Sequence, residues 1–180
     1  RHVRHSYRPH TMILAPSEGG IWAPVPAAPG LQTAPGLIVY RFGAALFYAN
    51  DHFFVENTRS LIDHAPSPVH WFVIDSGAIT DLDYSAARSV GELCEMLKKM
   101  GVDVIFARVN QYLRSDMERH GITPIVGTDR IFSTLHEALR LAGVEQPGHA
   151  QMGCSARASM RCFQLAMRSV RYRFTGPCSG

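Results

Sequence analysis

The spacing of hydrophobic and polar residues predicts alternating strands and helices in the middle of the chain. Several short apolar runs are rich in β-branched and aromatic residues, which is typical of strands buried on both faces of a sheet. The most regular of them, at 70–75, has only apolar residues between His70 and its final aspartate. The predicted strands are 37–42, 45–48, 70–75, 102–107 and 125–126, and a short edge strand is expected at 12–15.

Between these runs, apolar residues recur every three or four positions, which is the period of an amphipathic helix. The clearest stripe begins after Asp83, a residue suited to capping a helix N-terminus, and ends before Gly101, which suits the left-handed position after a helix. Thr134 and Glu137 have the spacing of a capping box. The predicted helices are 51–64, 84–100, 111–120 and 134–143.

Strands that alternate with helices require crossover connections, so residues 37–143 are predicted to form one α/β domain with a largely parallel sheet. The strands 37–42 and 45–48 are expected to form an antiparallel edge of that sheet. Residues 1–36 are interpreted as an arm followed by a linker, because proline and glycine crowd residues 15–36. Residues 144–180 are interpreted as a C-terminal extension.

Charge is distributed unevenly along the chain. The formal net charge is +3, yet the two ends are each net positive and the middle is mildly acidic. A nucleic-acid-binding protein usually concentrates positive charge on its folded module, so nucleic acid is not expected as a partner. The basic ends favour an anionic lipid surface instead. The sequence has no run of about 18 apolar residues, so no membrane-spanning helix is expected in it.

The C-terminal extension leaves two interpretations open. Its apolar residues fall near one face of a helix with arginines beside them, as in a basic amphipathic helix that lies on anionic lipid. The alternative, which we favour, is a flexible extension rich in serine and glycine. The apolar positions are Met160, Phe163, Met167, Val170 and Phe174.

The four cysteines and nine histidines do not indicate a metal site. Cys94 lies in the apolar stripe of the 84–100 helix, where a buried, reduced thiol is predicted. Cys154, Cys162 and Cys178 lack the paired spacing of zinc ligands. The histidines are scattered singly, which is typical of surface or capping positions. We therefore expect no metal.

The acidic residues after the 70–75 strand suggest chemistry that the surrounding sequence does not support. Asp81 and Asp83 form an Asp-x-Asp pattern similar to the nucleophile loop of haloacid-dehalogenase-type phosphotransferases. That loop follows its strand directly, whereas this strand ends at Asp75, so capping of the next helix by Asp83 and Ser85 is the favoured interpretation. Asp75 lies where a receiver domain has its phosphoacceptor, but no acidic pair follows the first strand. The sequence contains no phosphate-binding glycine loop.

Three segments resemble the STAS domain at the C-terminus of SulP-type sulfate permeases. They are PGLIVYRFGAALFYAN at 35–50, WFVIDSGAITDLDYSAA at 71–87 and GTDRIF at 127–132, and the resemblance covers about 35–143. It implies a mixed, largely parallel sheet with about four helices packed mainly on one face. It also implies that the arginines and histidines at the start of the chain follow the last membrane helix on the cytoplasmic side.

The resemblance further implies a non-catalytic domain at the cytoplasmic face of the inner membrane, within an integral membrane transporter for sulfate or a similar anion. Such a domain regulates transport through contacts with its own transmembrane domain, with a second protomer or with a cytosolic regulatory protein. Some members of the family are thought to bind guanine or adenine nucleotides, so GTP or ATP is the cofactor to consider. No other cofactor is expected.

The family name also covers anti-sigma factor antagonists, whose switch is a phosphorylated serine in an Asp-Ser-Ser-Gly motif. Aligned on Asp83, this chain has Tyr84 and then Ser85, so a serine-kinase switch is not expected. Open α/β sheets bind their ligands at strand carboxyl ends. The candidate surface for an anion, a nucleotide or a partner protein, with no catalytic residue assigned, is therefore Asn50, Asp51, Asp75, Asp81, Asp83, Tyr84 and Ser85.

Overall fold

One mixed sheet organises the chain. The computed structural model describes residues 9–18 and 21–144, all within the first of two units, Arg1–Pro147 and Gly148–Gly180. In these residues, five strands lie in the order β2-β1-β3-β4-β5; β1 is antiparallel to β2 and β3, and β3, β4 and β5 are parallel. The strands are β1 (Thr11–Pro16), β2 (Trp22–Pro26), β3 (Leu37–Phe42), β4 (Trp71–Asp75) and β5 (Asp103–Ala107).

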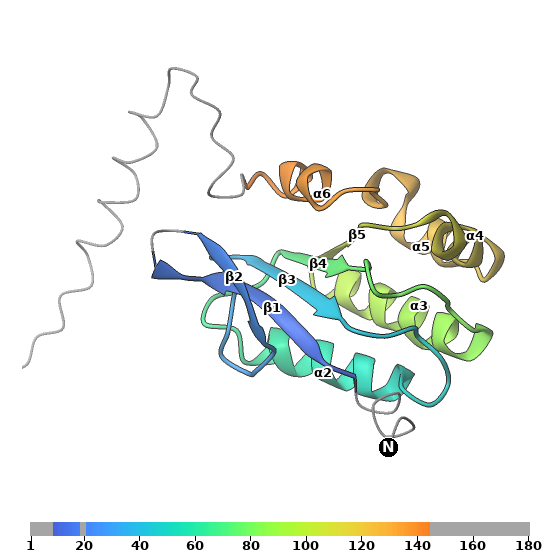
Figure 1. The fold of residues 1–180 in the computed structure, drawn as a ribbon, viewed down its shortest axis with the longest axis horizontal. Helices are drawn as coiled ribbons and strands as arrows, with labels where there is room; N and C mark the ends of the chain where they lie inside the picture. Colours follow the sequence, from blue (N-terminus) through green and yellow to red (C-terminus); the bar gives the residue numbers. More distant parts are fainter. Residues whose placement is uncertain (1–8, 19–20, 145–180) are drawn as a thin grey trace, which may run out of the picture. The chain divides into compact units, whose positions relative to one another are not determined.

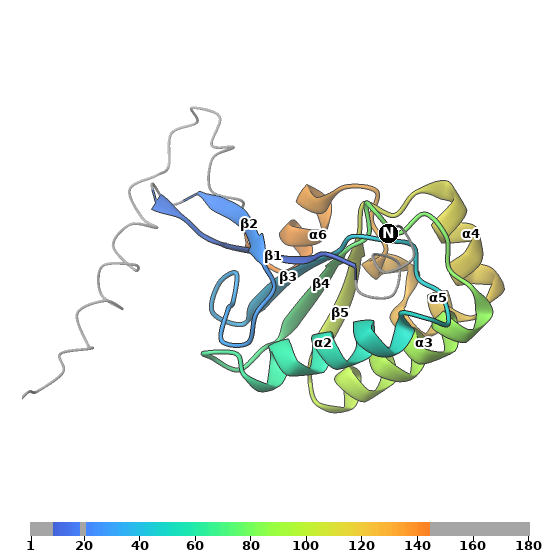
Figure 2. The same ribbon diagram turned by 60° about the horizontal axis from the view of Figure 1, so that its bottom comes forward.

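Helices cover the two faces of the sheet unequally. Helices α2 and α3 pack side by side on one face together with α5, and α6 lies alone among the described helices on the other (Figures 1 and 2). The described helices are α2 (Asp51–Asp63), α3 (Tyr84–Lys99), α4 (Gln111–Arg119), α5 (Ile122–Val126) and α6 (Leu135–Leu141), with a 3-10 turn η2 at Thr128–Arg130. The prediction of an α/β fold with helices mainly on one face is confirmed.

Strand alternation sends apolar side chains into two cores. Tyr40, Phe72 and Phe106 point toward α2 and α3 in the larger core, whereas Val39 and Val73 point toward α6 in the smaller one. Burying one such side chain contributes roughly 1.5–3 kcal/mol to folding. The central strands are therefore apolar on both faces, which is why they read as unbroken hydrophobic runs in the sequence.

Two of the predicted strands were wrong. At 45–48 only Leu46 forms an isolated bridge, to Leu82, and residues 48–50 form a turn. At 125–126 the chain is helical, because those residues close α5. Ile122 and Val126 are one helical turn apart and both are buried, so a single turn serves the core as well as a strand would.

The antiparallel edge of the sheet comes from β1 and β2, inside the range interpreted as arm and linker. Prolines at 24 and 26 favoured an unpaired linker, but β2 is an edge strand, where alternate N–H groups face away from the sheet and proline is tolerated. Further along the same range, Thr33 is fully buried and its hydroxyl oxygen accepts a hydrogen bond from the Val39 amide at 2.8 Å. Parts of the range interpreted as a linker are therefore paired in the sheet or packed against it.

Candidate interaction surface

Three loops meet at one edge of the sheet, where the parallel strands β3, β4 and β5 end. They are residues 43–50, 76–83 and 108–110. The first two are joined through their backbones: the Leu46 amide donates to the Asp81 carbonyl at 3.0 Å, and the Asp83 amide donates to the Leu46 carbonyl at 3.2 Å. This edge carries most of the residues that the sequence singled out.

Asp83 fixes the geometry of the edge with both of its carboxylate oxygens. Its Oδ1 accepts from the Ala86 amide at 2.8 Å and caps α3, as predicted. Its Oδ2 accepts from the Tyr48 amide at 2.9 Å, which the sequence did not indicate. One side chain thus orders a helix start and the neighbouring loop.

Asn50 and Asp51 serve the fold rather than an open surface. Asn50 is fully buried; its amide group donates to the Ala45 carbonyl at 2.9 Å, and its Oδ1 accepts from the Phe47 amide at 3.0 Å. Asp51 is also buried, and its Oδ2 accepts from the Ser89 hydroxyl at 2.8 Å, which ties α2 to α3. Asn50 stands at the N-cap of α2 without capping it through its side chain.

Asp81, Tyr84 and Ser85 are exposed and point outward from the edge. Asp81 makes only a local contact, in which its Oδ1 accepts from the Leu82 amide at 3.0 Å. Tyr84 is 66% exposed, and its ring meets that of His120 edge-on, with 5.9 Å between centroids. These three residues are the members of the predicted set that are exposed to solvent.

Two further tyrosines at this edge were missed by the sequence analysis. Tyr48 lies in the β3–α2 loop and is 70% exposed, and Tyr112 lies in the first turn of α4 and is 79% exposed. Tyr48 precedes α2 and Tyr112 lies at the start of α4, so the place of both along the chain could be predicted from the sequence. The exposure of their rings depends on loop geometry. We call Tyr48, Tyr84 and Tyr112 together the tyrosine edge.

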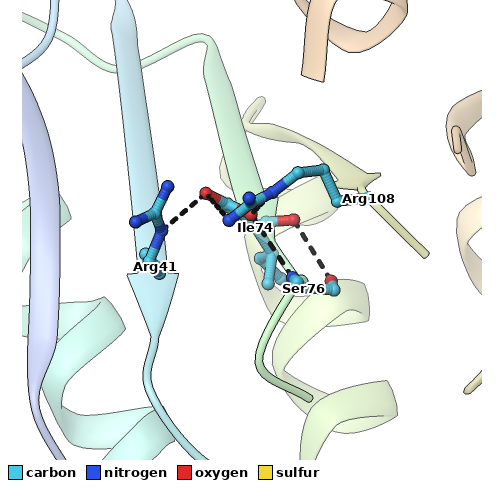
Figure 3. Close-up of polar contacts among 6 residues, drawn as sticks. Arg41, Ile74, Ser76 and Arg108 are labelled. Atoms are coloured by element: carbon cyan, nitrogen blue, oxygen red, sulfur yellow. Dashed lines mark hydrogen bonds and ion pairs between the residues drawn. The ribbon is translucent and has the colours of Figure 1, made fainter. Parts of the chain in front are cut away.

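Asp75 is separated from the other predicted residues because its side chain lies on the sheet face that carries α6. It is almost fully buried and binds two arginines, one in β3 and one directly after β5, on either side of β4 (Figure 3). Arg41 Nε contacts Oδ2 at 2.8 Å, and Arg108 Nη2 contacts the same oxygen at 2.7 Å while its Nε binds Oδ1. The structure therefore places the predicted residues in two groups rather than one.

The sheet register explains the arginine pair. Arg41 of β3 and Ala107 of β5 lie level with Asp75 of β4, so Arg108 follows directly at the strand end. The backbone of Arg108 is left-handed, with φ of 55°. Arg41 is a charged residue in an otherwise apolar strand, and that pattern could have marked it in the sequence. Its partner Asp75 could be identified only from the register of β3 against β4.

The described residues include few reactive groups and no evident metal ligands. No cluster of three or more His, Cys, Asp or Glu side chains suited to a metal ion occurs in that part of the chain. Cys94 is buried, as predicted, and burial raises the pKa of its thiol to about 12. Burial likewise raises the pKa of Tyr40 above its ordinary value. Of the helices that the structure describes, none has the length and apolar character to cross a membrane.

Comparison with known proteins gives a consistent family. The family model for the STAS domain matches residues 28–138. A probable sulfate transporter of Mycobacterium tuberculosis is 31% identical over 140 residues, covering 77% of this chain and 25% of the transporter. High affinity sulfate transporter 2 of Stylosanthes hamata is 23% identical over 145 residues, covering 76% of this chain and 22% of that protein. The chain thus spans about a quarter of the length of these relatives.

Solved structures show the same fold at low sequence identity. A sulfate transporter family protein from Wolinella succinogenes has a TM-score of 0.52 at 18% identity, covering 58% of this chain and 83% of that one. The murine Slc26a9 anion transporter, in its inward-facing state, has a TM-score of 0.63 at 15% identity, covering 78% of this chain and 23% of that one.

Proposed function

The chain belongs to the STAS domain family, and from that premise we propose that it is the regulatory domain of a membrane transporter for sulfate or a related anion. The relatives that share its sequence are transporters by name. The domain's role in this proposal is to be bound rather than to turn over a substrate, at the cytoplasmic face of the membrane. The observation that carries the proposal is the tyrosine edge.

Exposed tyrosines are well suited to a protein interface. A tyrosine offers a large apolar ring with a polar tip, and such residues supply much of the binding energy where proteins meet. The loops that present these rings are already ordered, since Asp83 caps α3 and Asn110 Oδ1 accepts from the Leu113 amide at 2.9 Å to cap α4. A partner that binds here therefore pays little to order the surface.

The path of the backbone favours the transmembrane domain as the partner. Strand β1 runs antiparallel to β3, so Thr11 lies opposite Phe42, at the end of β3. The Gly43 amide donates to the His10 carbonyl at 2.9 Å, which places the approach to β1 at the edge where the three loops meet. We propose that the partner that docks on the tyrosine edge is the transmembrane domain, rather than a second protomer or a cytosolic regulatory protein.

The test replaces two of the tyrosines in the full-length transporter. With Tyr48→Ala and Tyr112→Ala together, we expect sulfate uptake to fall several-fold while the melting temperature of the isolated 180-residue chain stays unchanged, because both rings are exposed. The matched control is Met100→Ala, which removes a 55% exposed side chain after α3, away from the edge. We expect that control to transport normally.

Crosslinking distinguishes the partner. With Tyr112→Cys, we expect a crosslink to the transmembrane domain, either of the same polypeptide or of a second transporter protomer. Crosslinking only to another copy of this domain, or only to a soluble protein, would assign the edge to a different partner. Normal uptake by a fully expressed double variant would end the docking proposal.

A further inference from the structure

Two guanidinium groups share one carboxylate at the end of β4. Asp75 forms ion pairs with both Arg41 and Arg108, and among the described residues it is the only carboxylate that pairs with either arginine. The group therefore has two positive charges and one negative charge. Positive charge left over in one place attracts a further anion.

The arginines also keep hydrogen-bond donors that Asp75 does not use. A guanidinium has five N–H groups. Arg41 reaches Asp75 through Nε alone, and Arg108 reaches it through Nε and Nη2. The contact drawn from Arg41 in Figure 3 leaves from Nε, and the two terminal nitrogens take no part in it. The arginine side chains are 35% and 40% exposed, so the remaining donors are accessible from solvent.

The fold holds the pair in place before any ligand arrives. Arg41 belongs to an inner strand of the sheet, and Asp75 is 1% exposed and fixed by both arginines. The Arg108 guanidinium packs so closely on Gly77 that a Cβ at residue 77 would lie 2.7 Å from its Cζ. A left-handed backbone in a residue other than glycine costs energy, and here it directs the side chain back to Asp75.

We propose that Arg41 and Arg108 bind a small tetrahedral oxyanion of the sulfate or phosphate class. The planar fork of a guanidinium matches the spacing of oxygens in such an anion, and a dianion would offset the excess positive charge. Asp75 positions both forks, and its negative charge keeps the affinity modest at a site that opens to solvent. The site does not depend on the docking role of the tyrosine edge.

The test is an NMR titration of the 180-residue chain with sodium sulfate, sodium phosphate and sodium chloride at equal ionic strength. We expect the Nε–H signals of Arg41 and Arg108 to shift and to saturate with sulfate, with phosphate or with both, and to change little with chloride. Saturation with neither oxyanion, or equal shifts with chloride, would overturn the proposal.

Arg41→Gln is the informative variant, because Asp75 keeps its two contacts to Arg108 and the fold should be retained. Losing one charge-assisted hydrogen bond should weaken oxyanion binding roughly tenfold. Arg59→Gln is the matched control, since it removes one exposed arginine from α2, on the other face of the sheet. Binding in Arg41→Gln as tight as in Arg59→Gln would refute the site. If Arg41→Gln is unstable, Arg41→Lys gives the same comparison with the charge kept, because Lys lacks the planar fork.

Discussion

At the scale of single residues, Asp83 shows how one carboxylate serves two elements. The sequence identified it as a helix cap because an aspartate before an amphipathic stripe is a local signal. Its bond to the Tyr48 amide joins residues 35 positions apart, and no local pattern reports such a contact. The same limit applies to Arg41 and Asp75, which are 34 positions apart and meet only through strand register.

Replacing Asp83 with Ala should therefore cost more than the loss of a cap. We expect the free energy of unfolding to fall by about 2 kcal/mol, because two backbone amides lose their acceptor. Thr134→Ala is the control: Thr134 caps α6 within its own capping box, so its loss should cost about 1 kcal/mol. Urea unfolding of both variants measures the difference. Equal losses would mean that the Tyr48 contact contributes nothing.

The burial of Cys94 predicts how the stability of the fold changes with pH. Burial, with a smaller effect from Glu95, raises the pKa of its thiol from 9.0 to about 12. The native state then holds the proton more tightly than the unfolded chain, so the thiol's contribution to stability is full below pH 9 and is lost as pH rises toward 12.

Wild type and Cys94→Ala should thus diverge in alkaline solution. From pH 8 to pH 10 the wild type should lose about 1 kcal/mol more of its free energy of unfolding than the variant. Comparing the two proteins cancels the titration of every other group. Parallel losses would contradict the burial of an inert thiol, as would rapid alkylation of Cys94 in the native protein.

At the scale of elements, long patterns were predictable from the sequence and short ones were not. Helix α3 and strand β4 matched their predicted ranges closely, because each carries a regular period and clear ends. The five residues of α5 are too few for an apolar run to distinguish a helical turn from a strand. Gly121 and Gly127, both with positive φ, flank this short helix and mark its two ends.

For the candidate surface, the position of a residue along the chain was predictable from the sequence, but its sheet face and burial were not. Which residues lie at strand carboxyl ends followed from the alternation of elements, and Asp81, Asp83, Tyr84 and Ser85 are found there. Which sheet face a side chain takes, and whether it is buried, depended on packing. For that reason Asp75 proved to belong to a separate arginine cluster, and Asn50 proved to be part of the fold.

At the scale of the whole molecule, the β1–β2 hairpin is part of the folded domain. Ile13 of β1 is fully buried in the larger core, and Leu14, next to it, packs in the smaller one. β1 also covers the edge of β3, which would otherwise present unpaired backbone groups. The match to the family model begins only at residue 28, after both strands.

A chain that begins at residue 28 should accordingly fold poorly. It would lose the Ile13 side chain from the core, and it would leave β3 as an exposed, apolar edge strand. We expect a loss of several kcal/mol in unfolding free energy, together with self-association through β3, measured by urea unfolding and light scattering against the 180-residue chain. Ile13→Ala in the 180-residue chain isolates the packing part, with an expected cost of about 2–5 kcal/mol. Because that variant keeps β1 paired to β3, it should self-associate no more than the wild type. If the shortened chain were as stable as the 180-residue chain and self-associated no more than it does, residues 11–26 would be a linker after all.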